Sequence, residues 1–284
     1  MVVDAHIHVQ PWGQFRPEAL RRMAHGRADL ETIKRVCGDP EAFLRFLDAE
    51  GVDRAVLVNY VSPDIIGFTD DVNAFVGRFC RDHRDRLVPV GGLHPRLSKD
   101  PAGDLSRLVE QHGLGALKLH PPHQLFRTNA YRDGGDLPAL ARFYERAQAL
   151  RLPVIVHTGT SIFPEARNKY GDPMDLDDVA VDFPELTLVL AHGGRPLWME
   201  TCFFLVRRHP NVFMDVSGIP PRALLTYFPR LADVADKALW GTDWPGPGVP
   251  GVRVNLEQFR ALPLPEKAKE AILWRNAQRV FPPA

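Results

Sequence analysis

The sequence predicts a single-domain α/β fold, a (β/α)8 barrel of the TIM type with a helical lid insertion after the first strand. Three observations favour this fold. Short apolar runs recur along the chain, amphipathic segments separate them, and histidine or aspartate follows several of the runs. A chain of 284 residues has the length of one such barrel, so residues 1–284 are interpreted as one domain.

Eight runs rich in β-branched and other apolar residues predict the strands. Because most of their positions are apolar, the sheet is expected to be covered on its outer face. The predicted strands are Val2–His6, Ala55–Val58, Leu87–Gly91, Ala116–Leu119, Val154–His157, Thr187–Leu190, Val212–Val216 and Ala238–Trp240.

Amphipathic segments between these runs are long enough for crossover helices. An open doubly wound sheet is the main alternative, but it favours a glycine-rich phosphate loop after the first strand, where this chain has His6-Ile7-His8. The predicted helical segments are Glu41–Glu50, Asp71–Arg81, Leu105–Gln111, Leu137–Leu150, Leu176–Phe183 and Leu197–Arg208.

The segment from Gln10 to Asp39 is long for a connection after a strand. It contains a predicted helix, Glu18–His25. Since functional loops of barrels gather at one end, we expect this insertion to form a lid over the barrel mouth.

The overall composition indicates a small-molecule ligand. Thirty-five basic residues balance thirty-five acidic ones, which gives no reason to expect nucleic acid or an anionic membrane as a partner. Three cysteines without CxxC spacing are typical of a reducing compartment. With neither a signal peptide nor a transmembrane run expected, the prediction is a cytoplasmic protein, and a homodimer is compatible with it.

Histidines and an aspartate at strand ends predict a metal site. In a strand, alternate side chains share a face, so His6 and His8 can bind one ion together. An isolated HxH pair can equally be two hydrogen-bonded histidines. His157 ends the fifth predicted strand, and His192 and Asp243 follow the sixth and eighth. Barrel enzymes carry their chemistry at these carboxyl ends. Nitrogen and carboxylate ligands without thiolate favour zinc and also fit iron, manganese or cobalt.

In several motifs along its length, the chain resembles the amidohydrolase superfamily. The similarity is to the amidohydrolase-related (amidohydrolase 2) branch, which includes metal-dependent hydrolases and nonoxidative decarboxylases of the aminocarboxymuconate-semialdehyde type. The motifs that carry it are Asp4-Ala5-His6-Ile7-His8, Leu117-Lys118-Leu119-His120-Pro121, Val156-His157-Thr158-Gly159, Leu190-Ala191-His192-Gly193-Gly194, Trp240-Gly241-Thr242-Asp243-Trp244-Pro245 and Arg275-Asn276-Ala277.

The resemblance implies that His6, His8, His157 and Asp243 hold the metal, while His192 lies beside it and acts on substrate or bound water. Asp243 is then the catalytic group that takes a proton from the water and passes it to a leaving group. His192 is the group that stabilises a developing oxyanion or delivers a proton.

Lys118 and Arg195 have open roles. Lys118 ends the fourth predicted strand, where some superfamily members carry a carboxylated lysine that bridges two metals; otherwise its ammonium binds a substrate carboxylate, or it is structural. One ion is favoured over two. Arg195 is the best candidate for binding an anion. Other polar or aromatic residues near the predicted mouth are interpreted as solvated or packing residues: Trp12, Asn59, His94, His120, His123, Arg167, Lys169 and Trp244.

Two enzyme activities fit these residues. The first expectation is hydrolysis of a C–N or C–O bond in an amide, cyclic amide, lactone or ester of a small, acidic molecule. The alternative is nonoxidative decarboxylation of an aromatic or unsaturated carboxylic acid by the same residues. A nuclease of the TatD type is disfavoured by Lys118, which stands where that family has an acidic ligand. A nonenzymatic metal scaffold is disfavoured because its coordination sphere is expected to be closed.

Overall fold

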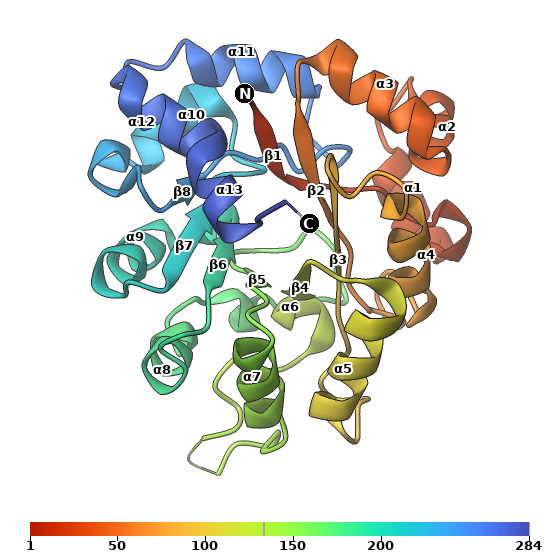
Figure 1. Cartoon of the computed structure of the whole chain (residues 1–284), viewed down its shortest axis with the longest axis vertical. Coiled ribbons are helices and arrows are strands. Elements are labelled where there is room, and N and C mark those ends of the chain that lie inside the picture. The colour runs from red at the N-terminus through yellow and green to blue at the C-terminus, as the bar shows by residue number, and fades with distance from the viewer. Residues whose placement is uncertain (133, 284) are drawn as a thin grey trace.

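The computed structural model describes residues 1–132 and 134–283. Eight parallel strands form one sheet in the order β1 to β8 (Figure 1). This confirms the predicted eight-stranded barrel, with each strand within a few residues of its predicted bounds. The strands are β1 Val3–Ile7, β2 Arg54–Val58, β3 Leu87–Gly91, β4 Ala116–Leu119, β5 Val154–His157, β6 Leu188–Ala191, β7 Val212–Asp215 and β8 Ala238–Leu239.

Helices surround the strands as a ring (Figure 1). The α-helices are α1 Pro17–Ala24, α2 Leu30–Gly38, α3 Pro40–Glu50, α4 Asp71–Cys80, α5 Pro101–His112, α6 Pro121–Gln124, α7 Leu140–Ala149, α8 Asp175–Asp182, α9 Met199–Arg208, α10 Pro221–Tyr227, α11 Val252–Arg260, α12 Glu266–Glu270 and α13 Asn276–Val280. Short 3-10 turns are η1 Trp12–Gln14, η2 Asn168–Gly171, η3 His192–Gly194 and η4 Leu231–Val234, and η5 Ala271–Arg275 is a π-helical segment.

Backbone hydrogen bonds connect the last strand region to the first. The amide of Ala5 donates to the carbonyl of Trp240 over 3.0 Å, and the amide of Asp243 donates to the carbonyl of His6 over 2.8 Å. These bonds nearly close the sheet into a barrel, and they fix the segment after β8 directly against the end of β1.

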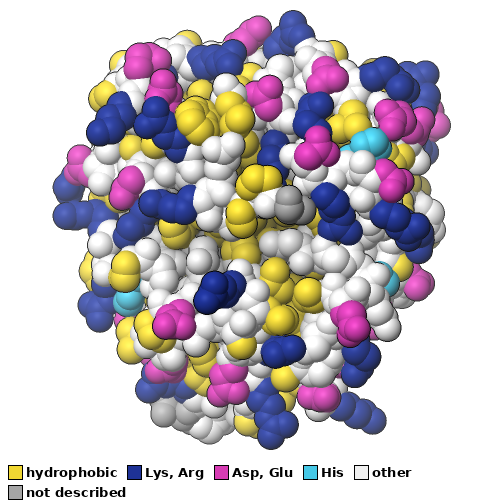
Figure 2. Space-filling view, viewed as in Figure 1, with side chains coloured by type: hydrophobic (Ala, Val, Ile, Leu, Met, Phe, Trp, Pro, Cys, Tyr) yellow, Lys and Arg dark blue, Asp and Glu magenta, His cyan; other side chains and the backbone are white. Residues whose placement is uncertain are grey.

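The barrel interior is filled by small β-branched residues and by the C-terminal segment. Strand residues such as Val3, Val56 and Ile155 form a buried cluster with Val280 and Phe281. In Figure 1, α13 and the C-terminus lie across the middle of the ring. The same face in Figure 2 mixes charged side chains of both signs around an apolar centre. The C-terminal segment therefore plugs this end of the barrel, and the cavity described below opens elsewhere.

The insertion after β1 folds as predicted at Glu18–His25, where α1 lies, and adds α2, which the sequence pattern did not indicate. Phe15 and Met23 of this insertion are buried in a cluster with Tyr60 and Ile66. Phe15, Met23 and Ile66 also line the cavity at the carboxyl ends of the strands. The insertion thus forms the predicted lid.

Two other features of the fold bear on the predictions. The position of His209 at the end of a helical segment predicts a surface residue, but the structure shows it 7% exposed, with its Nε2 2.7 Å from Asp177 Oδ1. The prediction was wrong because the end of α9 lies against α8, which carries Asp177. None of the helices in the described part of the chain combines the length and apolarity needed to cross a bilayer.

Candidate active site

The predicted site residues gather at the carboxyl ends of the strands. His6 lies near the end of β1, His157 ends β5, His192 follows β6 and Asp243 follows β8. With Lys118 of β4, they line one cavity of about 120 Å³. Its remaining lining residues are His8, Gln10, Phe15, Met23, Tyr60, Ile66, His120, His123, Thr160, Ser161, Ile162, Phe163, Arg195, Gly246 and Pro247.

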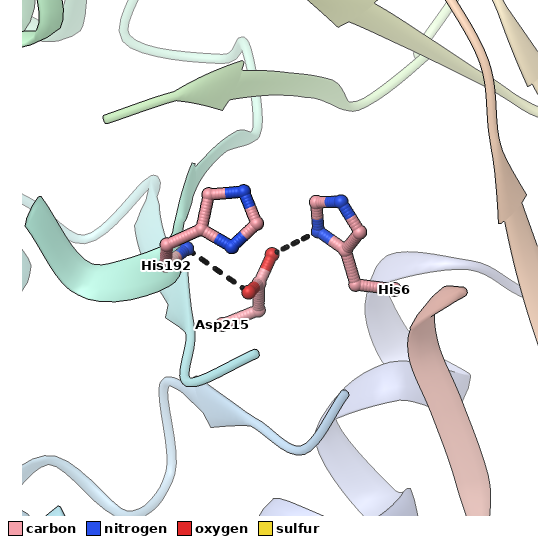
Figure 3. A group of neighbouring side chains, drawn as sticks. All are labelled: His6, His192 and Asp215. Atoms are coloured by element: carbon pink, nitrogen blue, oxygen red, sulfur yellow. Dashed lines mark hydrogen bonds and ion pairs between the residues drawn. The ribbon is translucent and has the colours of Figure 1, made fainter. Parts of the chain in front are cut away.

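The His6 imidazole is oriented by a carboxylate that the sequence analysis missed. His6 Nδ1 lies 2.8 Å from Asp215 Oδ2, and both side chains are 1% exposed (Figure 3). Because an ionised carboxylate only accepts hydrogen bonds, Nδ1 carries the hydrogen and Nε2 keeps its lone pair. His6 Nε2 is buried without a hydrogen-bond partner among the described residues.

His8 has the same tautomer for a different reason. Its Nδ1 lies 2.6 Å from the carbonyl oxygen of Val58, which can only accept, so Nδ1 carries the hydrogen. His8 Nε2 lies 3.0 Å from Asp243 Oδ1. In neutral His8 these two atoms are both acceptors, so a proton or a cation must lie with them.

These atoms fit a divalent cation. His6 Nε2, His8 Nε2 and an Asp243 oxygen lie within 4.8 Å of one another, and His6 Nε2 is 3.9 Å from Asp243 Oδ1. A cation would satisfy three acceptors that otherwise face one another. His157 lies outside this three-residue cluster, but its Nε2 is also buried without a partner in the described structure and it lines the same cavity. His6, His8, Asp243 and His157 are therefore the residues that would hold a metal ion.

His192 is held by the same aspartate and by a serine. Its amide donates to Asp215 Oδ1 over 3.1 Å (Figure 3). Its Nδ1 lies 3.2 Å from the carbonyl oxygen of Ser217. The Nδ1 atom therefore donates, and Nε2 of the neutral ring is an acceptor. His6, His192 and Asp215 could also be read as a metal cluster. Because the Asp215 oxygens already accept bonds from His6, His192 and Ser217, we assign this carboxylate a supporting role.

The backbone is strained at two of the predicted site residues. His192 and Asp243 both have φ of +65°, a left-handed conformation that is uncommon for residues other than glycine. Such strain is found at functional sites, where the surrounding structure enforces it. Here the amide bonds of His192 to Asp215 and of Asp243 to the His6 carbonyl hold both residues in place.

Cationic side chains lie beside Asp243. Lys118 is 1% exposed and its Nζ has no hydrogen-bond partner within the described chain. Burial lowers the pKa of Lys118 to about 8, although Asp215 and Asp243 oppose this shift. Arg195 Nη2 donates to Asp243 Oδ2 over 3.2 Å. Burial alone would raise the pKa of Asp243, but the hydrogen bond and charge of His8, followed by His6 and Arg195, lower it to about 2.

Sequence reasoning undervalued two histidines after β4. His120 stacks on His157 with ring centroids 3.8 Å apart and on His123 at 3.6 Å. Both line the cavity, whereas they had been interpreted as packing or solvated residues. Their signal was the Lys118-Leu119-His120 sequence at a strand end. Asp215 gave a similar signal, because it is a carboxylate next to the end of the seventh predicted strand, Val212–Val216.

A parallel barrel with this histidine and aspartate set at its carboxyl rim defines the class of metal-dependent barrel enzymes. The chain belongs to the amidohydrolase family, whose profile matches residues 3–282. No curated protein matches it. The family membership confirms the resemblance that the motifs indicated.

Solved structures share the fold at low identity. An uncharacterised TIM-barrel protein from Bordetella bronchiseptica is 22% identical, covers 98% of this chain and 97% of its own, and has a TM-score of 0.76. A 5-carboxyvanillate decarboxylase from Novosphingobium aromaticivorans, complexed with manganese and a nitrobenzoic acid, is 14% identical. The match covers 98% of this chain and 94% of the decarboxylase, with a TM-score of 0.65. A 4-oxalomesaconate hydratase from Rhodopseudomonas palustris is 20% identical. The match covers 99% of this chain and 96% of the hydratase, with a TM-score of 0.65.

Proposed function

We propose that this enzyme is a metal-dependent nonoxidative decarboxylase of a small aromatic or unsaturated carboxylic acid. The observation that carries the proposal is the pair of cations at the cavity. Lys118 Nζ and Arg195 Nε are both buried without a hydrogen-bond partner among the described residues. A carboxylate in the cavity would provide the acceptors that these donors lack, and burial strengthens such charge-assisted bonds.

The apolar part of the cavity supports a hydrophobic body for this acid. Phe15 and Met23 come from the lid, and Ile66 and Phe163 come from loops after β2 and β5. Polar groups thus lie at the strand ends, while apolar side chains lie toward the lid. An acid with an apolar ring or chain matches this division, because its carboxylate can face the strand ends and its carbon skeleton the lid.

The residues of the chain have distinct proposed roles. A divalent cation, when bound by His6, His8, His157 and Asp243, would polarise substrate oxygen atoms or lower the pKa of a bound water. Lys118 and Arg195 would orient the carboxylate. Loss of carbon dioxide breaks the C–C bond, and a proton must replace the carboxylate on carbon. Asp243 and the Nε2 atom of His192 are the acceptors that would carry this proton from the substrate or from water.

Hydrolysis, the first expectation from the sequence, is the second candidate. One observation favours it: the low pKa of Asp243, set by His8, His6 and Arg195 against burial, keeps this carboxylate ionised. An ionised carboxylate can accept a proton from an attacking water, which a protonated carboxyl group cannot do. Decarboxylation is preferred over hydrolysis because several of the similar structures are named decarboxylases. They include a 2,6-dihydroxybenzoate decarboxylase and 5-carboxyvanillate decarboxylases.

The deciding experiment compares the two reactions on the same preparations. The purified protein is stripped of metal and reloaded separately with zinc, the metal expected from the ligand types, and with manganese, which a similar decarboxylase binds. Hydroxybenzoates and unsaturated diacids labelled with ¹³C in the carboxylate are assayed by NMR for release of carbon dioxide and bicarbonate. Lactones, amides and esters of the same acids are assayed for acid or amine release. Turnover of the lactones, amides or esters without turnover of the labelled acids would overturn the decarboxylase proposal.

Elemental analysis of the reloaded protein gives the number of ions. We expect one ion per chain, retained in Lys118→Ala and lost in His6→Ala. Two ions, with one lost in Lys118→Ala, would support a carbamate-bridged pair instead. The predicted homodimer and cytoplasmic location remain proposals, which size measurements in solution and cell fractionation can test.

A further inference from the structure

A group of polar side chains separate from the metal ligands lines the cavity on the side of β4 and β5. His123 of α6 lies between a tyrosine and a serine: its Nδ1 is 3.0 Å from the Tyr60 hydroxyl, and its Nε2 is 2.7 Å from Ser161 Oγ. All three residues line the cavity. Tyr60 and His123 are 7% and 3% exposed, whereas Ser161 is half-buried. This chain of hydrogen bonds therefore leads from the interior to the cavity.

The donors in the Tyr60–His123 and His123–Ser161 bonds can be assigned. Only one of the two possible directions gives the buried Tyr60 hydroxyl hydrogen an acceptor. If His123 Nδ1 donated to Tyr60, the phenol hydrogen would have no acceptor in the described part of the molecule, and it is buried. If Tyr60 donates to Nδ1, the ring carries its hydrogen on Nε2 and donates it to Ser161 Oγ. The second arrangement satisfies every buried hydrogen, so we assign it.

The Ser161 hydroxyl is then obliged to donate toward the cavity. Its oxygen accepts from His123 Nε2 and, over 3.2 Å, from the amide of Phe163, which fills its two acceptor positions. The serine backbone is held as well, because its amide donates to Asn168 Oδ1 over 2.8 Å. One hydrogen remains, on a fixed oxygen at the cavity wall.

We propose that Ser161 is a specificity-determining hydrogen-bond donor for a second oxygen substituent of the substrate, such as a hydroxyl, phenolate or additional carboxylate. This inference rests on the proposed function, because it takes the ligand to be a small carboxylic acid. His120 extends the same subsite: it stacks on His123, and its Nδ1 is buried without a partner among the described residues. Tyr60 and His123 are positioning residues that fix the direction of the serine hydroxyl.

The first test measures the tautomer of His123 and does not depend on any substrate. Nitrogen-15 NMR of histidine-labelled protein is recorded for the wild type and for His123→Gln, which identifies the His123 signals by their loss; Ser161→Ala identifies them by their shift if the first variant does not fold. A protonated Nε2 is expected. A protonated Nδ1 would mean that Ser161 donates to the ring, and it would overturn the inference.

The second test measures ligand preference. The zinc-loaded protein is titrated by calorimetry with 2-, 3- and 4-hydroxybenzoate and with the matched methylbenzoates. For at least one position the hydroxyl compound should bind about 5- to 10-fold tighter than its methyl analogue, as expected for one hydrogen bond, and Ser161→Ala should remove this preference. Ser106→Ala is the control, because its hydroxyl bonds the Ala102 carbonyl on α5.

The outcomes separate the two proposals. Binding of benzoates with no hydroxyl preference, or a preference that survives in Ser161→Ala, would overturn the inference while leaving the decarboxylase standing. If no benzoate binds the wild type, the aromatic part of the proposed substrate class is wrong, and the tautomer of His123 alone decides whether Ser161 presents its hydrogen to the cavity.

Discussion

Asp215 Oδ2 lies 2.8 Å from His6 Nδ1, across 209 positions of sequence, and this contact turns the unshared lone pair of His6 toward Asp243. The same carboxylate accepts the amide of His192. One buried aspartate at the end of β7 thus orients His6 in β1 and His192 after β6. Carboxylate–histidine pairs of this kind fix the ring tautomer and raise the basicity of a metal ligand.

Asp215→Asn is expected to weaken metal affinity by about 10- to 100-fold. The amide can still accept from His6, but it no longer carries the negative charge that strengthens the lone pair at Nε2. The measurement is a competition titration with a metal chelator. Asp177→Asn is the matched control, since Asp177 forms a comparable bond of 2.7 Å to His209 away from the cavity. Equal affinities for both variants and the wild type would contradict the role given to Asp215.

Asp243→Asn is expected to lower kcat by about 10²- to 10⁴-fold at saturating metal, because a group that transfers protons contributes a factor of this size. The fold should persist, since the amide of residue 243 that bonds the His6 carbonyl is unchanged. Circular dichroism checks the fold, and the assays of carbon dioxide or acid release check the rate. A variant with the wild-type kcat would remove Asp243 from the proton transfer.

The sequence pattern was sufficient for the barrel and for the side chains that point into it. Apolar runs are local signals, so β1 to β8 were recognisable one at a time. His6, His8, His157 and Asp243 became a site prediction only together, because they all lie at strand ends. The tautomers were not, because each depends on an acceptor far along the chain, such as Asp215 for His6. The left-handed backbone of His192 and Asp243 is likewise imposed by tertiary hydrogen bonds and not by local propensity.

Helices after β7 were also missed, for a related reason. The segments that form α10 to α13 are short or rich in proline and charge, so their apolar periodicity is weak in isolation. Their positions are set by packing on the barrel: Asn276 Nδ2, for example, donates to the carbonyls of Ala235 and Ala238 over 2.7 Å each. Tertiary contacts here override weak local preference.

Arg27→Ala is expected to loosen the lid and the loop after β8 together. Arg27 Nη2 donates to three carbonyl oxygens of that loop, at Pro245 (2.9 Å), Gly246 (3.0 Å) and Val249 (3.1 Å). Losing these charge-assisted bonds should speed amide hydrogen exchange at residues 246 and 249 by about 10-fold or more, which mass spectrometry measures. Arg35→Ala, an exposed arginine of the same lid, should leave exchange unchanged. Unchanged exchange in Arg27→Ala would show that the contact does not hold the loop.

Lys118→Met is expected to stabilise the metal-free protein at neutral pH, with a pH dependence that identifies the cause. Burial lowers the pKa of Lys118 from 10.5 to about 8, so the folded state disfavours its charged form. Below pH 8 the lysine is protonated in both the folded and unfolded states, and the full cost of about 3 kcal/mol applies. Between pH 8 and 10.5 the folded state holds fewer protons, so the cost fades as pH rises. The advantage of the methionine variant in urea unfolding should therefore be largest below pH 8 and decline above it.

Lys237→Met is the control. It removes bonds of 2.8 Å to the carbonyls of Val206 and His209, so it should destabilise the protein instead. A Lys118→Met variant that is less stable than the wild type at pH 7 would mean that this ammonium has a partner that compensates its burial.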